Sequence, residues 1–209
     1  MMLNYTLIKL NDLVKAFSEN ENIVNDVLST FSCVNNRDVD SFLKEKAVLF
    51  DQQGWSKTHL VFTSYKNEMV LVGYFTLAPK SFVIIRNNRK SKFDKIGNTL
   101  MKRIAKHGRF DRETNQYTIS APLIGQLGKN DKYPDLISGD VLLKYACDTV
   151  KEAQSIIGGR FVYLECEDKP KLLDFYNENG FVSFGRRTLE ADEKDIGGNY
   201  LIQMLKYLK

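Results

Sequence analysis

Two repeat distances between apolar residues divide the chain into candidate strands and candidate helices. Runs rich in Val, Ile, Phe, Tyr and Thr predict strands at 5–10, 59–64, 68–77, 116–127, 160–165, 181–186 and 200–208. Apolar residues spaced three and four apart predict helices at 11–17, 38–50, 138–157 and 171–179. The predicted order is one strand, two helices, two strands, an insert, then strand, helix, strand, helix and two final strands.

Turn residues support several of these boundaries. The segment 65–67 between two strands predicts a β-hairpin, and we interpret 82–85 as an extension of its second strand beyond a break near Pro79. Gly54, the pair at 158–159 and Gly180 each follow a predicted helix. The sequence has no internal repeat and no linker rich in Pro, Gly and Ser. We therefore expect one domain over residues 1–209 with an insertion at about 86–115.

Basic residues are concentrated in one segment of the chain. The 209 residues include 30 Lys and Arg and 26 Asp and Glu, a net charge of +4. Residues 86–112 hold ten of the basic and two of the acidic residues, so this segment carries +8 and the rest of the chain carries −4. Within the segment, apolar residues recur at helical spacing and predict an amphipathic helix; they are Phe93, Ile96, Leu100 and Ile104.

Two interpretations of this basic segment stand nearly even. Clustered Lys and Arg release counterions from phosphates, which favours an anionic partner, with tRNA or another nucleic acid first. The same pattern is also typical of a solvated helix that packs its apolar stripe on an acidic body. An anionic membrane surface is a weaker third reading.

Composition excludes several classes of protein. Cys33, Cys147 and Cys166 are widely spaced and form no C-x-x-C pattern, so neither a disulfide set nor a zinc site is indicated. The only histidines, His59 and His107, have no ligand at metal spacing, which disfavours a metalloenzyme and a Ser-His-Asp hydrolase. The first residues lack the pattern of a secretion signal, and no run reaches the length of a membrane helix. We expect a cytoplasmic protein without membrane insertion or metal, and allow for a homodimer.

Two stretches carry candidate chemistry. Residues 126–130 end a strand and lead through a turn into the predicted helix at 138–157, and a helix N-terminus after such a turn favours anions. Gly128 inside the strand suggests a bulge with unpaired backbone groups, while the plainer interpretation is an ordinary connection capped by Ser138. Tyr176 lies near the end of a short helix, where a packed core tyrosine is the commoner case.

Taken together, these features resemble the GNAT acetyltransferase superfamily, and within it the bacterial toxins that acetylate aminoacyl-tRNA. The resemblance is carried by FSCVNNRDVDSFLKEKA (31–47), VGYFTLAPKSFVI (72–84), PLIGQLGKNDKYPDLISGDVLLKYA (122–146), FYNENGF (175–181) and the last strand LIQMLKYL. It implies an α/β (α+β) fold with a central, mostly antiparallel mixed sheet flanked by helices. The basic helical insertion would lie between the third and fourth strands, where it is longer than in the family.

The resemblance also implies an activity, the transfer of an acetyl group from acetyl-CoA to a primary amine, with aminoacyl-tRNA the leading acceptor. The main chain of Leu127, Gly128 and Lys129 would hold the pantetheine arm. The pyrophosphate would meet the following turn and first helical turn, at Lys132, Ile137, Ser138, Gly139 and Asp140. Tyr176 would protonate the leaving thiolate, and Glu165 is the nearest candidate base or water-positioning group, with a solvated strand-end carboxylate as its plainer interpretation.

The phosphate loop departs from the superfamily pattern Gln/Arg-x-x-Gly-x-Gly/Ala. The matching stretch is 134–139, in which only Gly139 is kept, and Ile137 brings a branched side chain to a place where the backbone approaches phosphate. Asp135 and Asp140 add negative charge, and Gln126 stands where the toxins carry an Arg. These departures motivate the alternative of a non-catalytic or weakly active GNAT-fold binding protein that engages nucleic acid or a protein partner through its basic insertion.

Overall fold

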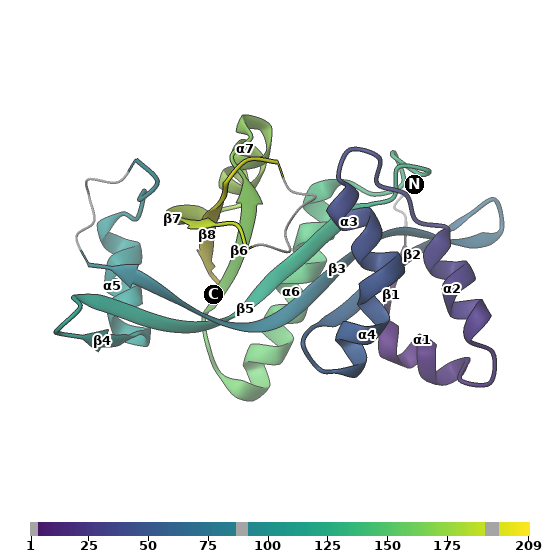
Figure 1. Cartoon of the computed structure of the whole chain (residues 1–209), viewed down its shortest axis with the longest axis horizontal. Helices are drawn as coiled ribbons and strands as arrows, with labels where there is room; N and C mark the ends of the chain where they lie inside the picture. The colour runs from purple at the N-terminus through teal and green to yellow at the C-terminus, as the bar shows by residue number, and fades with distance from the viewer. Residues whose placement is uncertain (1–3, 87–91, 191–196) are drawn as a thin grey trace. The chain divides into compact units, whose positions relative to one another are not determined.

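The computed structural model describes residues 4–86, 92–190 and 197–209. Within these ranges the strands form an eight-stranded sheet in the order β1-β2-β3-β5-β6-β8-β7, with β4 paired to β5 (Figure 1). The strands are β1 Tyr5–Lys9, β2 Lys57–Tyr65, β3 Glu68–Ile85, β4 Arg109–Asp111, β5 Gln116–Lys129, β6 Phe161–Glu167, β7 Val182–Thr188 and β8 Tyr200–Tyr207. The pairs β1-β2, β2-β3, β4-β5, β6-β8 and β7-β8 are antiparallel, which confirms the mixed α/β fold with a mostly antiparallel sheet.

The helices occupy the predicted places with some differences in extent. They are α1 Leu10–Ala16, α2 Glu21–Ser29, α3 Arg37–Ser41, the π-helix η1 Phe42–Lys46, α4 Ala47–Gln52, α5 Asn98–His107, α6 Gly139–Ile157 and α7 Pro170–Glu178. The predicted helix at 38–50 is three consecutive helical pieces, and α2 was not predicted. Part of the predicted insertion, residues 87–91 with Arg89 and Lys90, lies outside the described residues.

The expected break near Pro79 is wrong, because β3 continues from Glu68 to Ile85. Pairing of β2 with β3 ends at Lys57 and Leu77. A proline two residues further on therefore removes no hydrogen-bond donor from the β2 ladder, and the strand accommodates it.

The chain divides into two compact units, and each is described by itself. Unit 1 comprises 1–78 and 124–146, and unit 2 comprises 79–123 and 147–209, so β3, β5 and α6 each belong partly to both. The prediction of a single domain with an insertion at about 86–115 stays a prediction.

Unit 1 is built on a core shared by its helices and the hairpin β2-β3. Its buried apolar residues include Leu10, Leu28, Phe31, Leu43, Leu60 and Tyr74. The Tyr74 hydroxyl donates a 2.6 Å hydrogen bond to the Val39 carbonyl, and its ring meets Phe31 edge to face with centroids 5.1 Å apart. Burial raises the pKa of Tyr74 well above its usual value, so this donor stays protonated. The hydroxyl thus ties α3 to the sheet.

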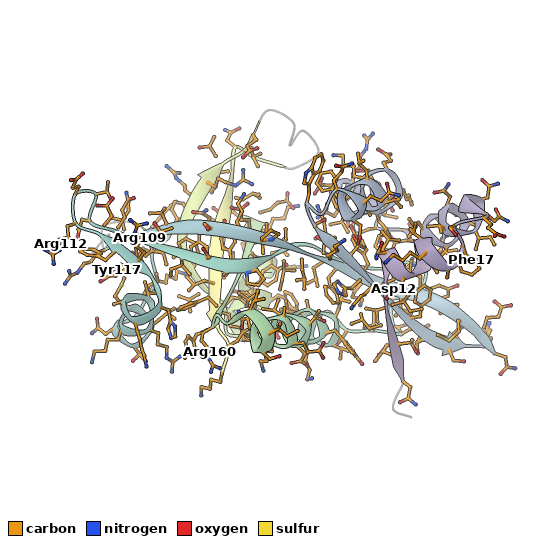
Figure 2. All side chains as sticks on the ribbon, turned by 90° about the horizontal axis from the view of Figure 1, so that it is seen from below. Asp12, Phe17, Arg109, Arg112, Tyr117 and Arg160 are labelled. Carbon is orange, nitrogen blue, oxygen red and sulfur yellow. The ribbon has the colours of Figure 1, made fainter. Side chains whose placement is uncertain are left out.

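Unit 2 has its own core, and α5 of the basic insertion is part of it. Ile104 on α5 is fully buried, and Leu100 and Met101 pack against the same cluster. The cluster also contains Phe82, Tyr117, Phe161, Tyr163 and Leu205. The predicted stripe is thus partly right: Leu100 and Ile104 lie in the helix, whereas Phe93 and Ile96 precede its start at Asn98. Arg109 and Arg112 lie at the end of the β4–β5 hairpin (Figure 2).

Candidate functional site

The end of β5 in unit 1 contains the three residues expected to hold a pantetheine arm. Leu127 and Lys129 are half-buried and Gly128 is buried. A Cβ on Gly128 would lie 2.4 Å from Val39 Cγ1 and 3.0 Å from Phe31 Cζ. An added Cβ would force the Val39 side chain to shift, because real Cβ atoms essentially never come so close to another atom. The close packing of β5 under α3 is therefore one physical reason for this glycine.

Asn130, directly after β5, organises the turn and was missed by sequence reasoning. Its side chain is fully buried. Oδ1 accepts hydrogen bonds from the backbone N–H groups of Ser32 and Lys132, both at 3.1 Å. Nδ2 donates to the carbonyls of Thr30 at 3.1 Å and Leu71 at 2.7 Å. One amide thus joins the α2–α3 loop, β3 and the turn before α6, and an Asn following a strand end was the only sequence signal for it.

The turn leads into α6 with a conventional cap. Ser138 Oγ accepts a 3.2 Å hydrogen bond from the Val141 N–H, as an N-cap serine does. Lys129 Nζ donates to the Pro134 carbonyl at 2.9 Å and so spans the turn. Lys132, Ser138 and Asp140 are exposed. The N-terminus of a 19-residue helix thus opens to solvent with one lysine in the preceding turn.

Ile137 is only 2% exposed, and its side chain belongs to the buried core. The sequence suggested that this branched side chain would stand where a phosphate approaches the backbone. Its burial removes that specific obstruction. The exposed Asp135 and Asp140 remain as negative charges beside the turn.

Gln126 contacts the helical layer of unit 1. Its Nε2 donates a 2.7 Å hydrogen bond to Asp38 Oδ2, and its backbone N–H donates to Thr76 Oγ1 at 2.8 Å. Asp38 lies in the first turn of α3. The glutamine therefore fixes β5 to α3 and to β3.

Tyr176 lies on α7 in unit 2 and is a buried residue, 8% exposed. Its centroid is 5.0 Å from that of Phe175 and 5.9 Å from that of Phe181. Burial, followed by the influence of Cys166, raises the pKa of Tyr176 above its usual value. The phenol is therefore fully protonated near neutral pH, the state that a proton donor requires.

Glu165 lies within β6, and the expectation of a solvated strand-end carboxylate is wrong. Its side chain is 10% exposed and forms an ion pair with Arg187, with 2.7 Å between Oε2 and Nη2. It also accepts hydrogen bonds from the Tyr163 hydroxyl and from Gln203 Nε2. Burial raises the pKa of Glu165, but the hydrogen bonds and charge of Arg187 and the Tyr163 hydroxyl outweigh this effect, so the net pKa is lowered. A carboxylate held ionised in this way is a weak proton acceptor.

The structure separates the predicted site residues into three places. Those at 127–129 and 132–140 are continuous in unit 1, whereas Tyr176 and Glu165 belong to unit 2. Tyr176 is influenced by the Cys166 thiol, and neighbouring residues of a strand point to opposite faces of the sheet. Cys166, the neighbour of Tyr176, and Glu165 therefore point to opposite faces of β6.

The described ranges contain neither a cluster of metal ligands nor a helix that could cross a membrane. No group of His, Cys, Asp or Glu in these ranges has the arrangement of a metal site. None of the described helices is long and apolar enough to cross a bilayer.

Comparisons with known proteins rest on structure alone. No family model and no curated protein sequence matches the chain. A solved structure described as a bacterial toxin matches with a TM-score of 0.63 and 15% identity over 99% of this chain and 92% of that one. AtaT, in a complex with acetyl-methionyl-tRNAfMet, matches with a TM-score of 0.61 and 16% identity over 95% and 94%.

A tyrosine-to-phenylalanine mutant of KacT matches with a TM-score of 0.59 and 17% identity over 95% of this chain and 93% of that one. AtaTR has been crystallised with acetyl-CoA and also matches, with a TM-score of 0.55 at 18% identity. Each of these matches extends over at least 95% of this chain and at least 92% of the solved one. The chain therefore shares the fold of KacT and of the toxin AtaT, which is the GNAT fold expected from the sequence.

Proposed function

We propose that this protein is an N-acetyltransferase that transfers the acetyl group of acetyl-CoA to a primary amine, with the amino group of an aminoacyl-tRNA as the acceptor. The observation that carries the proposal is the continuous arrangement of the β5 end, the Asn130 turn and the N-terminus of α6 within a GNAT fold. The crystal structure of AtaTR with acetyl-CoA supports this choice of donor, and the solved complex of AtaT with acetyl-methionyl-tRNAfMet supports this choice of acceptor.

The residues of unit 1 fit an acetyl-CoA site in three respects. The backbone at Leu127, Gly128 and Lys129 ends a strand, the geometry that an extended pantetheine arm needs for hydrogen bonding. The side chain of Ile137 is buried, and the exposed N-terminus of α6 offers its dipole to a pyrophosphate together with Lys132. Ser138 caps this helix, and Gly139 and Asp140 are its first two residues.

Tyr176 supplies the proton in the proposed reaction. The acceptor amine, with a pKa of about 8 to 10, attacks as the free base, so that a C–N bond forms while the thioester C–S bond breaks. The Tyr176 hydroxyl donates its proton to the leaving sulfur, and the proton lost by the amine restores the phenol. Backbone N–H groups at the strand end stabilise the negative charge that develops on the carbonyl oxygen. Glu165, which Arg187 holds ionised, positions the Tyr163 and Gln203 side chains rather than removing a proton.

Titration of acetyl-CoA into the protein by calorimetry tests this proposal directly. We expect saturable binding that Lys132→Gln weakens, because that lysine is exposed in the turn before α6. Lys102→Gln, an equal change of charge on α5, serves as the matched control and leaves binding unchanged. If no binding is seen at high micromolar acetyl-CoA, the proposed acetyltransferase activity is contradicted.

A second function is favoured by the negative charges at the turn. Asp135 and Asp140 are exposed beside the helix N-terminus and oppose a pyrophosphate. A GNAT-fold protein that binds nucleic acid or a protein partner without turnover would retain RNA binding in the complete absence of acetyl-CoA binding. The same calorimetry, run beside an RNA-binding assay, separates the two functions.

A further inference from the structure

The described residues of the basic insertion from Lys92 onward include two parts with different surroundings. On α5, Ile104 is buried in the core of unit 2, and Arg103 lies 4.4 Å from the Tyr207 ring centroid. The residues before α5 instead run along the strand β7. Lys95 donates its backbone N–H to the Ser183 carbonyl at 2.9 Å. This second part, together with β7 and β8, builds a feature that the fold itself does not require.

Arg186 of β7 packs against two adjacent aromatic rings. Its guanidinium lies 5.3 Å from the Phe93 centroid and 5.2 Å from the Tyr200 centroid, and these two rings meet at 5.7 Å. Lys92 Nζ lies 4.9 Å from the Phe93 ring. Such stacking fixes a guanidinium and leaves its N–H groups for another partner.

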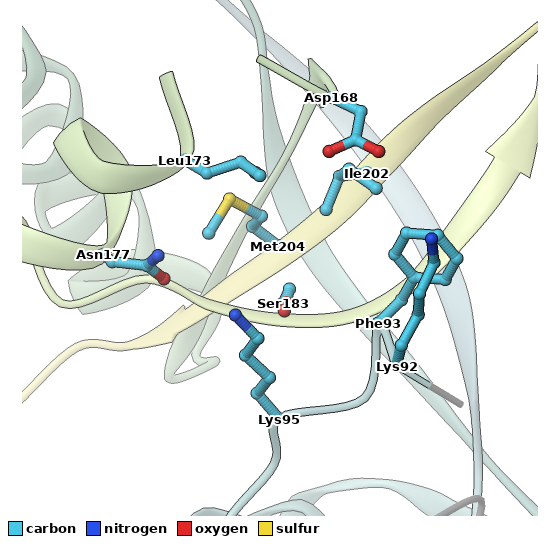
Figure 3. A pocket seen from close by; sticks show the side chains of 9 residues that line it. All are labelled: Lys92, Phe93, Lys95, Asp168, Leu173, Asn177, Ser183, Ile202 and Met204. Atoms are coloured by element: carbon cyan, nitrogen blue, oxygen red, sulfur yellow. The ribbon is translucent and has the colours of Figure 1, made fainter. Parts of the chain in front are cut away.

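A pocket of about 180 Å³ opens beside this stack (Figure 3). The Lys95 ammonium points toward Asn177 and Ser183, and Phe93 and Lys92 line the other side of the opening. Its apolar wall comes from α7 and β8, namely Leu173, Ile202 and Met204. Asp168 lines the pocket as well, and its Oδ2 accepts the Tyr200 hydroxyl at 2.6 Å.

The charges around the pocket are unbalanced. Lys92, Lys95 and Arg186 are exposed, and none of them has a carboxylate at salt-bridge distance within the described ranges. Three cations without ion-pair partners beside an aromatic ring are complementary to phosphate next to a flat base. The volume is smaller than the roughly 300 to 1,000 Å³ of pockets that enclose drug-sized ligands, so it suits one base rather than a longer segment.

We propose that this pocket binds one unpaired nucleotide of an RNA, with its phosphates contacted by Lys92, Lys95 and Arg186 and its base placed between Phe93 and the apolar wall. The other carboxylate oxygen of Asp168, Oδ1, would accept a hydrogen bond from a ribose hydroxyl or a base amino group. This inference rests on the proposed function, because an aminoacyl-tRNA acceptor would bring a single-stranded RNA end to this protein. It assigns RNA contact to the 92–95 part of the insertion and a structural role to α5.

The test removes three positive charges at the pocket and compares the effect on RNA binding with that of removing three positive charges elsewhere in the insertion. One variant carries Lys92→Gln, Lys95→Gln and Arg186→Gln. The matched control carries Lys102→Gln, Lys106→Gln and Arg109→Gln, whose side chains are also exposed. Binding of a short, fluorescently labelled single-stranded RNA is followed by anisotropy across a salt series, and melting temperatures verify that both variants fold. A double variant, Lys92→Gln with Lys95→Gln, replaces the triple one if loss of the Arg186 stack unfolds the protein.

Loss of three phosphate contacts should reduce the slope of log K against log salt by about 2, at about 0.7 for each contact with a single strand. The control should change the slope by less than half as much. Phe93→Leu should weaken binding about fivefold or more with the slope unchanged, because base stacking carries no counterion release. Equal effects of the two triple variants would contradict the proposal. They would show that RNA is attracted electrostatically by the whole basic insertion and not by the pocket.

Two further measurements distinguish the nucleotide pocket from a site for an acidic protein and from the proposed enzyme activity. Displacement of the RNA by a polyglutamate peptide at lower concentration than by unlabelled RNA would overturn the proposal in favour of an acidic protein partner. Calorimetry with acetyl-CoA distinguishes this proposal from the proposed function. If the native protein binds no acetyl-CoA while the pocket variants still lose RNA affinity, the acetyltransferase proposal is wrong and the nucleotide-binding proposal is supported.

Discussion

Gly128 and Val39 are packed so closely that a Cβ on the glycine would lie 2.4 Å from Val39 Cγ1. Gly128→Ala should therefore lower the free energy of unfolding by about 1 to 3 kcal/mol, the usual cost of overpacking. Denaturant unfolding of Gly128→Ala, Val39→Ala and the double variant measures this cost. We expect the double variant to be more stable than the sum of the two single changes predicts, because truncating Val39 makes room for the added methyl group. Strict additivity would show that the two residues do not compete for space.

Asn130→Ala should destabilise the protein by about 2 to 4 kcal/mol, because it leaves buried N–H and C=O groups without partners. Asn130→Asp keeps the oxygen that accepts from Ser32 and Lys132 but places a second oxygen against the carbonyls of Thr30 and Leu71. That variant should be less stable at neutral pH than at mildly acidic pH, where the carboxyl is protonated and again donates. Thermal melts over a pH series provide the measurement, and equal stability of Asn130→Asp at both pH values would count against the donor role.

Tyr176→Phe should slow acetyl transfer about tenfold or more while leaving acetyl-CoA affinity and the melting temperature nearly unchanged. The reason is that phenylalanine keeps the ring packed against Phe175 and Phe181 and loses only the proton. The pKa of Tyr176 is raised, so in the native enzyme no loss of rate from its ionisation should appear below about pH 10. Turnover of the variant equal to that of the native enzyme would remove Tyr176 from the proposed role.

Arg187→Ala should cost about 3 to 5 kcal/mol of stability, because it leaves the Glu165 carboxylate largely buried without its cation. The additional change Glu165→Gln should restore part of that loss. Since the pKa of Glu165 is lowered by folding, its stabilising effect is present above the unfolded pKa of about 4.3 and is lost as the pH falls. Glu165→Gln should therefore unfold less steeply in acid than the native chain. The Glu165→Gln variant should keep most of the turnover. Complete loss of turnover would indicate that Glu165 is the catalytic base.

Local sequence patterns predicted those parts of the fold that depend on neighbouring residues. The hairpin with positive φ at Lys66 and Asn67 and the long helix α6 followed from turn chemistry and from apolar spacing. Apolar spacing did not predict that the π-helix divides 38–50 into three helical pieces. The apolar residues before and after the π-helix pack into the same core, so the spacing resembles that of one continuous helix. The helix α2 was missed although Ile23, Val24, Val27 and Leu28 are spaced as on one helical face.

The candidate site shows the same limit. Residues 127–140 are consecutive, so the sequence placed them correctly between a strand and a helix. Asn130 contacts Thr30 and Leu71, 100 and 59 positions away, and no local pattern reveals such contacts. Arg187 as the partner of Glu165 was hidden for the same reason, because it comes from another strand 22 residues further along.

The hydrogen bond from Lys95 to Ser183 also has a consequence for solubility. Strand β7 stands last in the order of the sheet, and an outermost strand with open backbone groups is a template for pairing with other chains. The charged segment that lies along β7 shields part of this edge. Deleting the segment would expose the edge to self-association, whereas exchanging single side chains leaves the shield in place.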